Sequence, residues 1–120
     1  DARVCGHARV CDNAWVYGNA QVWGNAWVYG NAQVSGDAWV RGDAWIDSKS
    51  AICAFSGFGS ELRTTTAFID KEIGIRIVCG CFTGTIEQFK EKVIETHGTE
   101  SKNGVLYLQM ANMIELRFAS

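Results

Sequence analysis

Residues 1–48 divide without remainder into eight six-residue repeats, which read DARVCG, HARVCD, NAWVYG, NAQVWG, NAWVYG, NAQVSG, DAWVRG and DAWIDS. Alanine is second and a β-branched aliphatic residue is fourth in every repeat. A unit this short cannot bury a core of its own, so its aliphatic side chains must stack on those of neighbouring units. The repeat therefore predicts a solenoid, in which each coil packs against the coils beside it.

The repeats resemble those of the hexapeptide-repeat proteins, whose fold is a left-handed parallel β-helix with three hexads in each triangular coil. The resemblance covers residues 1–48 of the 120. It implies between two and three coils, with the small alanines and the fourth-position aliphatic residues facing inward. Glycine and Asn or Asp then flank the corners, where tight turns favour such residues. Because the chain opens at Asp1 already in register, we expect further repeats upstream in a longer parent protein.

Aromatic residues are expected on the outside of the solenoid. With three hexads in a coil, residues 18 apart stack on one side, which places Trp27 and Trp45 above Arg9. Large exposed aromatic surfaces usually mark a partner interface, and ligand stacking is the alternative. Proteins of this family commonly form trimers, so the resemblance implies a homotrimer. The predicted interface residues are Trp15, Tyr17, Trp23, Trp27, Tyr29, Trp39 and Trp45.

A second domain is predicted over residues 49–120, because all six phenylalanines and all five lysines lie there, whereas all five tryptophans lie in the repeats. Three runs, 51–58, 62–70 and 75–82, have the composition of strands and are separated by turn-like segments. The fold class is therefore expected to be mainly β, with a left-handed parallel β-helix followed by a small α+β domain of three strands and one or two helices. This domain is expected to dock on the solenoid, where it would cap the open end, or on another subunit.

Two helices are expected after the strands. Thr85, with Gln88 three residues later, has the spacing of a capping box, and the helix that follows carries Ile86, Phe89, Val93 and His97 on one stripe before Gly98. The final segment has both helical and alternating spacing of its apolar residues. We favour a helix that begins at about Asn103.

Bulk composition excludes several classes of protein. An apolar content of 48% with 20% charged residues is typical of a folded globular chain, and a net charge of −2 provides no basic field for duplex nucleic acid. No run approaches the roughly 20 apolar residues of a membrane helix, and no secretory leader is evident, so we expect no membrane association and a cytoplasmic location. Five cysteines, an odd number, favour free buried thiols over a disulfide framework.

The polar stretch from Ser56 to Thr66 is the candidate ligand site. Its glycines free backbone amides, its hydroxyls supply donors, and Arg63 can pair with a phosphate or carboxylate. The amides at the start of the helix near Thr85 could add a second anion site. A plain hairpin with a threonine-rich strand explains the same residues. The candidate anion-binding residues are Ser56, Gly57, Gly59, Ser60, Arg63, Thr64, Thr65, Thr66, Thr83 and Thr85.

No catalytic residue, metal or cofactor is predicted. Many hexapeptide-repeat proteins are acyltransferases with a histidine base, but His7 occupies an ordinary corner position and no loop interrupts the coils to build an acceptor pocket. His97 is explained by the helix end. Cys79 and Cys81 are expected on one face of a strand, and with Cys53 and His97 they could supply four zinc ligands. Their spacing is not diagnostic, and small packed thiols are the favoured interpretation.

The aromatic-rich repeats, followed by Cys-Gly-Cys-Phe-Thr-Gly-Thr at residues 79–85, resemble hexapeptide-repeat proteins of bacteriophages and prophages. This resemblance implies a viral accessory protein in the host cytoplasm. We rank first a non-enzymatic oligomeric binding protein, which sequesters a small anionic, nucleotide-like host ligand or inhibits a host protein. An acyltransferase-like or degenerate transferase ranks second, and a structural assembly protein third.

Overall fold

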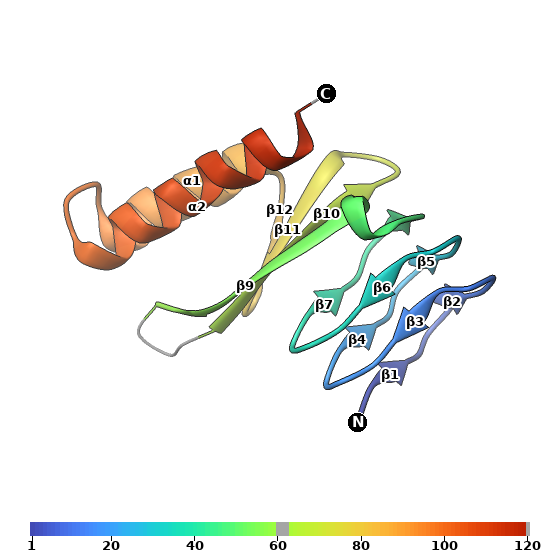
Figure 1. The fold of residues 1–120 in the computed structure, drawn as a ribbon. Helices are drawn as coiled ribbons and strands as arrows, with labels where there is room; N and C mark the ends of the chain where they lie inside the picture. Colours follow the sequence, from blue (N-terminus) through green and yellow to red (C-terminus); the bar gives the residue numbers. More distant parts are fainter. Residues whose placement is uncertain (60–62, 120) are drawn as a thin grey trace.

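The computed structural model describes residues 1–59 and 63–119, which form three layers: a solenoid, a β-sheet and a pair of helices (Figure 1). The first layer is a parallel β-solenoid, as predicted. Its strands are two residues long, and they are β1 (Arg3–Val4), β2 (Arg9–Val10), β3 (Trp15–Val16), β4 (Gln21–Val22), β5 (Trp27–Val28), β6 (Gln33–Val34), β7 (Trp39–Val40) and β8 (Trp45–Ile46).

Strand pairing confirms that three hexads make one coil. The solenoid strands pair in the orders β1-β4-β7, β2-β5-β8 and β3-β6, all parallel. Trp27 pairs with Arg9 on one side and with Trp45 on the other, so the predicted columns of residues 18 apart are present. Glycine at the sixth position of the hexads has a positive φ, and Asp12 adopts the same conformation, with a φ of 58°, where the second hexad lacks that glycine.

The solenoid core consists of the inward alanines and β-branched aliphatic residues. Burial increases along the solenoid, because Val4 in the first coil is 46% exposed whereas Val22 and Val40 above it are fully buried. Backbone amides donate toward the following coil: Cys5 N donates to Val22 O over 3.0 Å, and Trp23 N donates to Val40 O over 3.0 Å. The last coil therefore presents amide donors that no further coil can accept.

The second layer is an antiparallel sheet with the order β12-β11-β10-β9. Its strands are β9 (Ile52–Phe58), β10 (Arg63–Asp70), β11 (Gly74–Cys79) and β12 (Phe82–Gly84), and a short 3-10 helix at Lys49–Ala51 joins it to the solenoid. The prediction of three strands was wrong, because the third predicted strand is two strands, β11 and β12. The run 75–82 is broken by the two-residue turn Gly80–Cys81, which pairs Cys79 with Phe82 across a hairpin. Gly80 has a φ of 59°, which suits the first position of such a turn.

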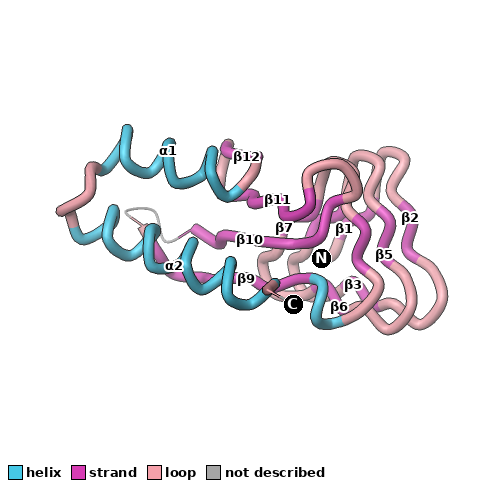
Figure 2. Tube along the Cα trace, turned by 90° about the horizontal axis from the view of Figure 1, so that it is seen from above, coloured by secondary structure: helices cyan, strands magenta, loops and turns pink. Residues whose placement is uncertain are grey.

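The third layer contains α1 (Ile86–His97) and α2 (Lys102–Phe118), which lie antiparallel and side by side (Figure 2). Thr85 caps α1 as predicted: its hydroxyl accepts from Gln88 N over 3.1 Å, and its own amide donates to Gln88 Oε1 over 2.9 Å. The final segment is a helix, as favoured. The side of the sheet that carries Ala67 and Ile77 packs against buried residues of both helices in one core cluster. Among the described residues, no helix is both long and apolar enough to cross a membrane.

The sheet closes the end of the solenoid. Phe68 on β10 is fully buried in the same core cluster as Ile46, so one core runs across the boundary between the two predicted domains. Thr66 Oγ1 accepts from Trp39 N over 3.1 Å, and Asp70 Oδ2 accepts from Asp43 N over 3.2 Å. Side-chain oxygens of β10 thus satisfy amides that the last coil leaves free.

Asp70 is the most heavily bonded of these capping groups. Its Oδ1 accepts from the amides of Glu72 and Ile73, over 2.9 and 3.2 Å, and Arg76 Nε lies 2.7 Å from its Oδ2. Burial acts to raise the pKa of Asp70, but the hydrogen bonds from Arg76, Glu72 and Ile73 and the charge of Arg76 outweigh it and hold the pKa below its usual value. The carboxylate is therefore charged and buried at neutral pH.

Candidate functional site

The residues predicted for one anion-binding cradle lie at several separate places. Ser56 and Thr64 face each other across β9 and β10, with their hydroxyl oxygens 2.9 Å apart. Thr64 also lines, together with Arg63, a pocket of about 370 Å³ between the sheet and Trp39 of the solenoid. Ser60 lies outside the residues that the structure describes.

The other four predicted threonines, like Thr64, have structural partners. Thr65 is buried and donates to the sulfur of Cys79 over 3.2 Å, and Thr66 accepts the solenoid amide described above. Thr83 accepts from an arginine of β11 over 3.1 Å, and Thr85 caps α1. These hydroxyls stabilise the sheet, the solenoid end and the helix start, and they do not converge on one point.

The two predicted glycines differ in their surroundings. Gly57 and Gly59 have φ values of 85° and 84°, but Gly57 borders open space, whereas a Cβ at Gly59 would collide with the hydroxyl of Tyr107 on α2. That hydroxyl donates to the carbonyl of Phe58 over 3.3 Å. Gly59 therefore permits the close approach of a side chain from α2.

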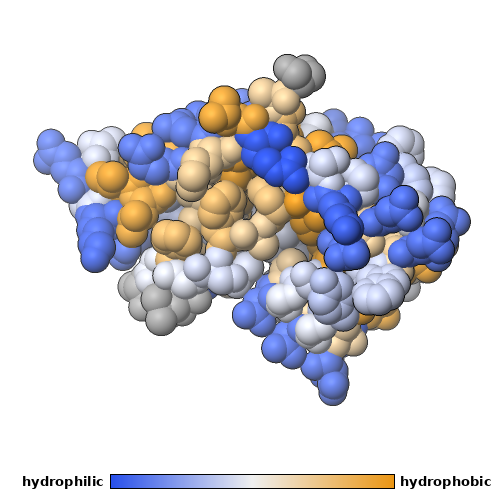
Figure 3. All heavy atoms as spheres, in the orientation of Figure 1, coloured by the Kyte–Doolittle hydropathy of each residue, from blue (hydrophilic) through white to orange (hydrophobic). Residues whose placement is uncertain are grey.

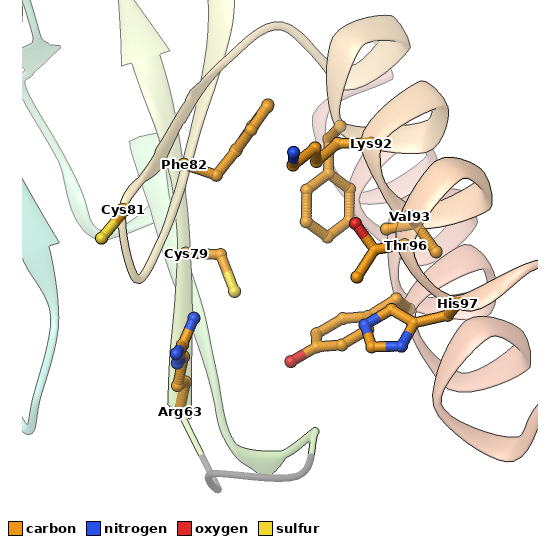
Figure 4. A pocket seen from close by; sticks show the side chains of 10 residues that line it. Arg63, Cys79, Cys81, Phe82, Lys92, Val93, Thr96 and His97 are labelled. Atoms are coloured by element: carbon orange, nitrogen blue, oxygen red, sulfur yellow. The ribbon is translucent and has the colours of Figure 1, made fainter.

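A second pocket, of about 210 Å³, lies between the sheet and α1 (Figure 4). Alternation along β11 places Cys79 on the face that carries Ile77, toward the helices. Helical spacing of three and four residues brings several α1 side chains together opposite it. The lining residues are Arg63, Cys79, Cys81 and Phe82 from the sheet and its turn, Phe89, Lys92, Val93, Thr96 and His97 from α1, and Tyr107 from α2.

This sheet–α1 pocket combines an aromatic wall with cationic groups. The ring centroids of Phe82 and Phe89 are 5.6 Å apart, those of Phe89 and Tyr107 5.9 Å, and His97 stacks on Tyr107 at 5.7 Å. Arg63 approaches from β10 and Lys92 from α1, and no Asp or Glu occurs among the lining residues in the described part of the chain. Lys92 has an exposed contact of 3.9 Å with a glutamate one turn on, which is too weak to neutralise it.

The hydroxyl of Tyr107 is held in its protonated form. Burial raises the pKa of Tyr107 to about 12, with further contributions from the charge of Cys79 and from a hydrogen bond to Cys79, while Arg63 acts in the opposite direction. Tyr107 is therefore uncharged at neutral pH, and its hydroxyl donates to the Phe58 carbonyl.

The cysteines are free, as predicted, but three of them, Cys5, Cys11 and Cys81, are exposed rather than buried. Cys79 and Cys81 do not share a strand face, because the turn separates them, and Figure 4 shows their sulfurs pointing apart. Burial raises the pKa of Cys53, and the nearby charge of Arg117 partly offsets it. Within residues 1–59 and 63–119, no group of three or more His, Cys, Asp or Glu side chains is placed to hold a metal ion.

Sequence reasoning named Arg63 for an anion site and Cys79, Cys81 and His97 for the zinc alternative, but it missed Lys92, Thr96 and Tyr107 as members of the same pocket. Lys92 and Thr96 are four residues apart and lie beside the apolar stripe of Phe89 and Val93, so their position next to the sheet was available from helical spacing. The position of Tyr107 could not be inferred from the sequence, because it depends on how α2 packs against the sheet.

The aromatic residues predicted for an interface form three groups on the solenoid. Trp15 and Tyr17 are 64% and 44% exposed and meet edge to face. Trp23 packs edge to face against the exposed Trp39. The third group contains Trp27, Tyr29 and Trp45.

Cations cover several of these rings. Arg9 lies 4.9 Å from the Trp27 centroid, Arg41 lies 4.9 Å from that of Trp23, and Lys71 of the sheet layer lies 5.4 Å from that of Trp45. Such contacts stabilise the stacked columns without any partner. Trp15 and Tyr17 therefore remain the most accessible part of the predicted interface.

The helix layer also exposes apolar surface. Figure 3 shows apolar residues gathered over the region of α2 and β9 on one face of the molecule. On α2, Val105, Met113 and Leu116 are 41%, 50% and 79% exposed. This surface was not among the predicted interfaces.

Comparison with known families gives a match in the repeats. The family model of the YdcK beta solenoid repeat matches residues 2–18, 8–24 and 20–36. The starting positions 2, 8 and 20 differ by 6 and 12 residues, which are one and two hexads. No curated protein and no solved structure matches the chain. The N-terminal repeats thus form a β-solenoid similar to the YdcK repeat.

Proposed function

We propose that this protein is a non-enzymatic binding protein that holds a small anionic ligand in the sheet–α1 pocket. The observation that carries the proposal is the approach of Arg63 and Lys92 from two sides of a cavity with an aromatic wall. A guanidinium and an ammonium group both donate charge-assisted hydrogen bonds to phosphate or carboxylate oxygens. The rings of Phe82 and Phe89 offer a surface for a flat group attached to that anion.

The size of the pocket restricts the ligand. Its volume of about 210 Å³ lies below the range of roughly 300–1,000 Å³ that is usual for drug-sized ligands. The pocket suits one ring with one anionic group, such as a mononucleotide whose remaining part extends toward solvent. A nucleotide-like host ligand, sequestered without chemical change, is consistent with this chemistry.

Calorimetry with AMP, and with adenosine as the uncharged control, tests the proposal. AMP is expected to bind, with an affinity that falls as salt is added, and adenosine is expected to bind at least about tenfold more weakly, because charge-assisted bonds contribute roughly 1.5–3 kcal/mol each. Lys92→Gln should weaken AMP binding about tenfold. The matched control Lys102→Gln removes an exposed lysine that lies outside the pocket lining and should have no effect. Equal binding of AMP and adenosine, or no binding of AMP and phenyl phosphate, would contradict the proposal.

We propose further that the solenoid is left-handed and assembles as a homotrimer, as in hexapeptide-repeat proteins. The high exposure of Trp15 and Tyr17 supports an assembly, because such surfaces are costly on an isolated chain. Light scattering should give three chains per particle, and Trp15→Ser should shift the distribution toward monomers. Open-ended polymers would instead favour the structural assembly role, and a thermal shift with acetyl-coenzyme A would favour the acyltransferase alternative.

The proposed biological setting is that of a phage or prophage accessory protein acting in the host cytoplasm. Its support is the resemblance of the repeats and of residues 79–85 to proteins of that type. Co-purification of a host nucleotide with protein expressed in bacterial cells, detected by native mass spectrometry, would support the sequestering role.

A further inference from the structure

The sheet–α1 pocket contains a thiol that simple anion binding does not use. Cys79 lies at the end of β11 on the face toward the helices, and Figure 4 shows its sulfur directed toward the space between the sheet and α1. Arg63, Lys92 and His97 line the same cavity. A nucleophilic atom therefore lies beside the cationic groups that would hold an anion.

A hydrogen-bond donor from the neighbouring strand contacts this sulfur. Thr65 Oγ1 donates to Cys79 Sγ over 3.2 Å, and the Tyr107 hydroxyl, which donates to the Phe58 carbonyl, belongs to the lining of the same pocket. Donors and cations stabilise the negative charge that a sulfur atom carries while it attacks. The site thus combines a nucleophile, groups that stabilise its charge, and cations that attract an anionic reagent.

We propose that Cys79 is a covalent modification site, at which the thiol exchanges with a small anionic disulfide drawn into the pocket by Arg63 and Lys92. The inference rests on the proposed function, because the same cations position both ligands. In the step, the Cys79 proton passes to water and the sulfur attacks one sulfur of the disulfide RS–SR. The new S–S bond forms as the old one breaks, and the other half leaves as RS⁻. The disulfide is the oxidant, so no further reactant is needed, and an added thiol reverses the step.

The other four cysteines provide internal comparisons in the same chain. Cys81 is two residues away and exposed, but its sulfur points out of the pocket. Cys53 has a raised pKa from burial. Cys5 and Cys11 are exposed on the solenoid, where Cys11 accepts a bond from the Trp27 indole over 3.2 Å. Exposure alone therefore predicts faster reaction at Cys5, Cys11 and Cys81, whereas electrostatic attraction predicts a preference for anionic reagents at Cys79.

Competing labelling reactions distinguish these two expectations. The intact protein is treated with dithiobis(nitrobenzoate), an anionic aromatic disulfide, or with dithiodipyridine, a neutral one, and labelling at each cysteine is followed by peptide mass mapping. The ratio of anionic to neutral rates at Cys79 should exceed the ratio at Cys81 by about tenfold. Lys92→Gln should lower the ratio at Cys79 severalfold and leave it unchanged at Cys81. The control Lys102→Gln should change neither ratio.

Equal ratios at the two cysteines, or a ratio at Cys79 that does not respond to Lys92→Gln, would overturn the inference. AMP titration of unmodified protein reports on the proposed function separately, because AMP cannot react with a thiol. Binding of AMP without an anionic preference at Cys79 removes this inference alone. An anionic preference at Cys79 without AMP binding removes only the proposed function.

Discussion

The solenoid and the sheet that covers its end bury different kinds of group. Inside the solenoid the buried side chains are alanine, valine and isoleucine, and each coil satisfies its backbone amides on the next coil. Among the described residues, the buried polar or charged ones are Thr65, Thr66 and Asp70, and all three lie on β10. Two of these three, Thr66 and Asp70, lie where the repeating hydrogen bonds stop, whereas Thr65 bonds to Cys79 on the helix side of the sheet.

This contrast shows what ends a repeating structure. A coil that is followed by another coil needs only shape and aliphatic surface, because the backbone supplies its own partners. The last coil has no such partner, and unsatisfied buried amides are costly. Thr66 and Asp70 supply the missing acceptors from a strand that runs across the coil. Stability should therefore be most sensitive at the junction.

Removal of the Asp70 carboxylate should have the largest effect. Asp70→Ala would leave Arg76 without its buried partner and three amides without an acceptor, and we expect a loss of about 3 kcal/mol in the free energy of unfolding. Urea denaturation provides the measurement. Asp37→Ala, which removes an exposed carboxylate of the solenoid, should cost less than about 0.5 kcal/mol. Similar losses in the two variants would show that the junction between the solenoid and the sheet is no more sensitive than the solenoid surface.

Acid should weaken the same junction, but less than removal of the side chain. Because the native pKa of Asp70 lies below its ordinary value of 3.8, its contribution is fully present above about that pH and is lost as the pH falls through the lower native pKa. The difference in unfolding free energy between wild type and Asp70→Ala should therefore shrink below pH 3.8. A difference that stays constant down to pH 2 would contradict this assignment.

Within the solenoid, the stability cost of truncating the fourth residue of a hexad should increase from the first coil toward the capped end. Val28→Ala removes fully buried methyl groups and should cost about 2 kcal/mol, whereas Val4→Ala, at a position that is 46% exposed, should cost less than half of that. Thermal or urea unfolding of the two variants tests the gradient. Equal costs would indicate that the first coil is covered in solution.

The smallest effect is expected at the exposed surface of α2. Leu116 is 79% exposed, so Leu116→Ser should change the unfolding free energy by no more than about 0.5 kcal/mol. Scanning calorimetry measures the shift in Tm. A loss above about 1 kcal/mol would show that this surface of α2 is buried in an assembly.

The solenoid could be predicted from the sequence because each residue's neighbours follow from its place in the hexad. Once three hexads make a coil, Trp27 must lie between Arg9 and Trp45, and the strand pairing confirms it. Local patterns also predicted both helices and the Thr85 cap. In each case the interacting groups are close in sequence or related by a fixed period.

The sheet–α1 pocket could not be predicted in the same way. Its formation depends on the turn at Gly80–Cys81, which the strand-like residues on both sides concealed, although a glycine at the first position of a two-residue hairpin is a recognisable signal. Tyr107 reaches its partner Phe58 across 49 residues of sequence, and no local pattern specifies that contact. Arg63 was correctly singled out, but its neighbours come from packing between layers.

β10 caps the last coil of the solenoid, so the number of coils before that coil can vary without changing the cap. Whole coils of three hexads are interchangeable, so an insertion of 18 residues would leave Thr66 and Asp70 facing the same last coil. Each added coil would move the pocket about 4.8 Å along the solenoid axis. The number of repeats therefore sets the distance between the first coil and the sheet–α1 pocket, in steps of one coil, without altering the contacts at the capped end.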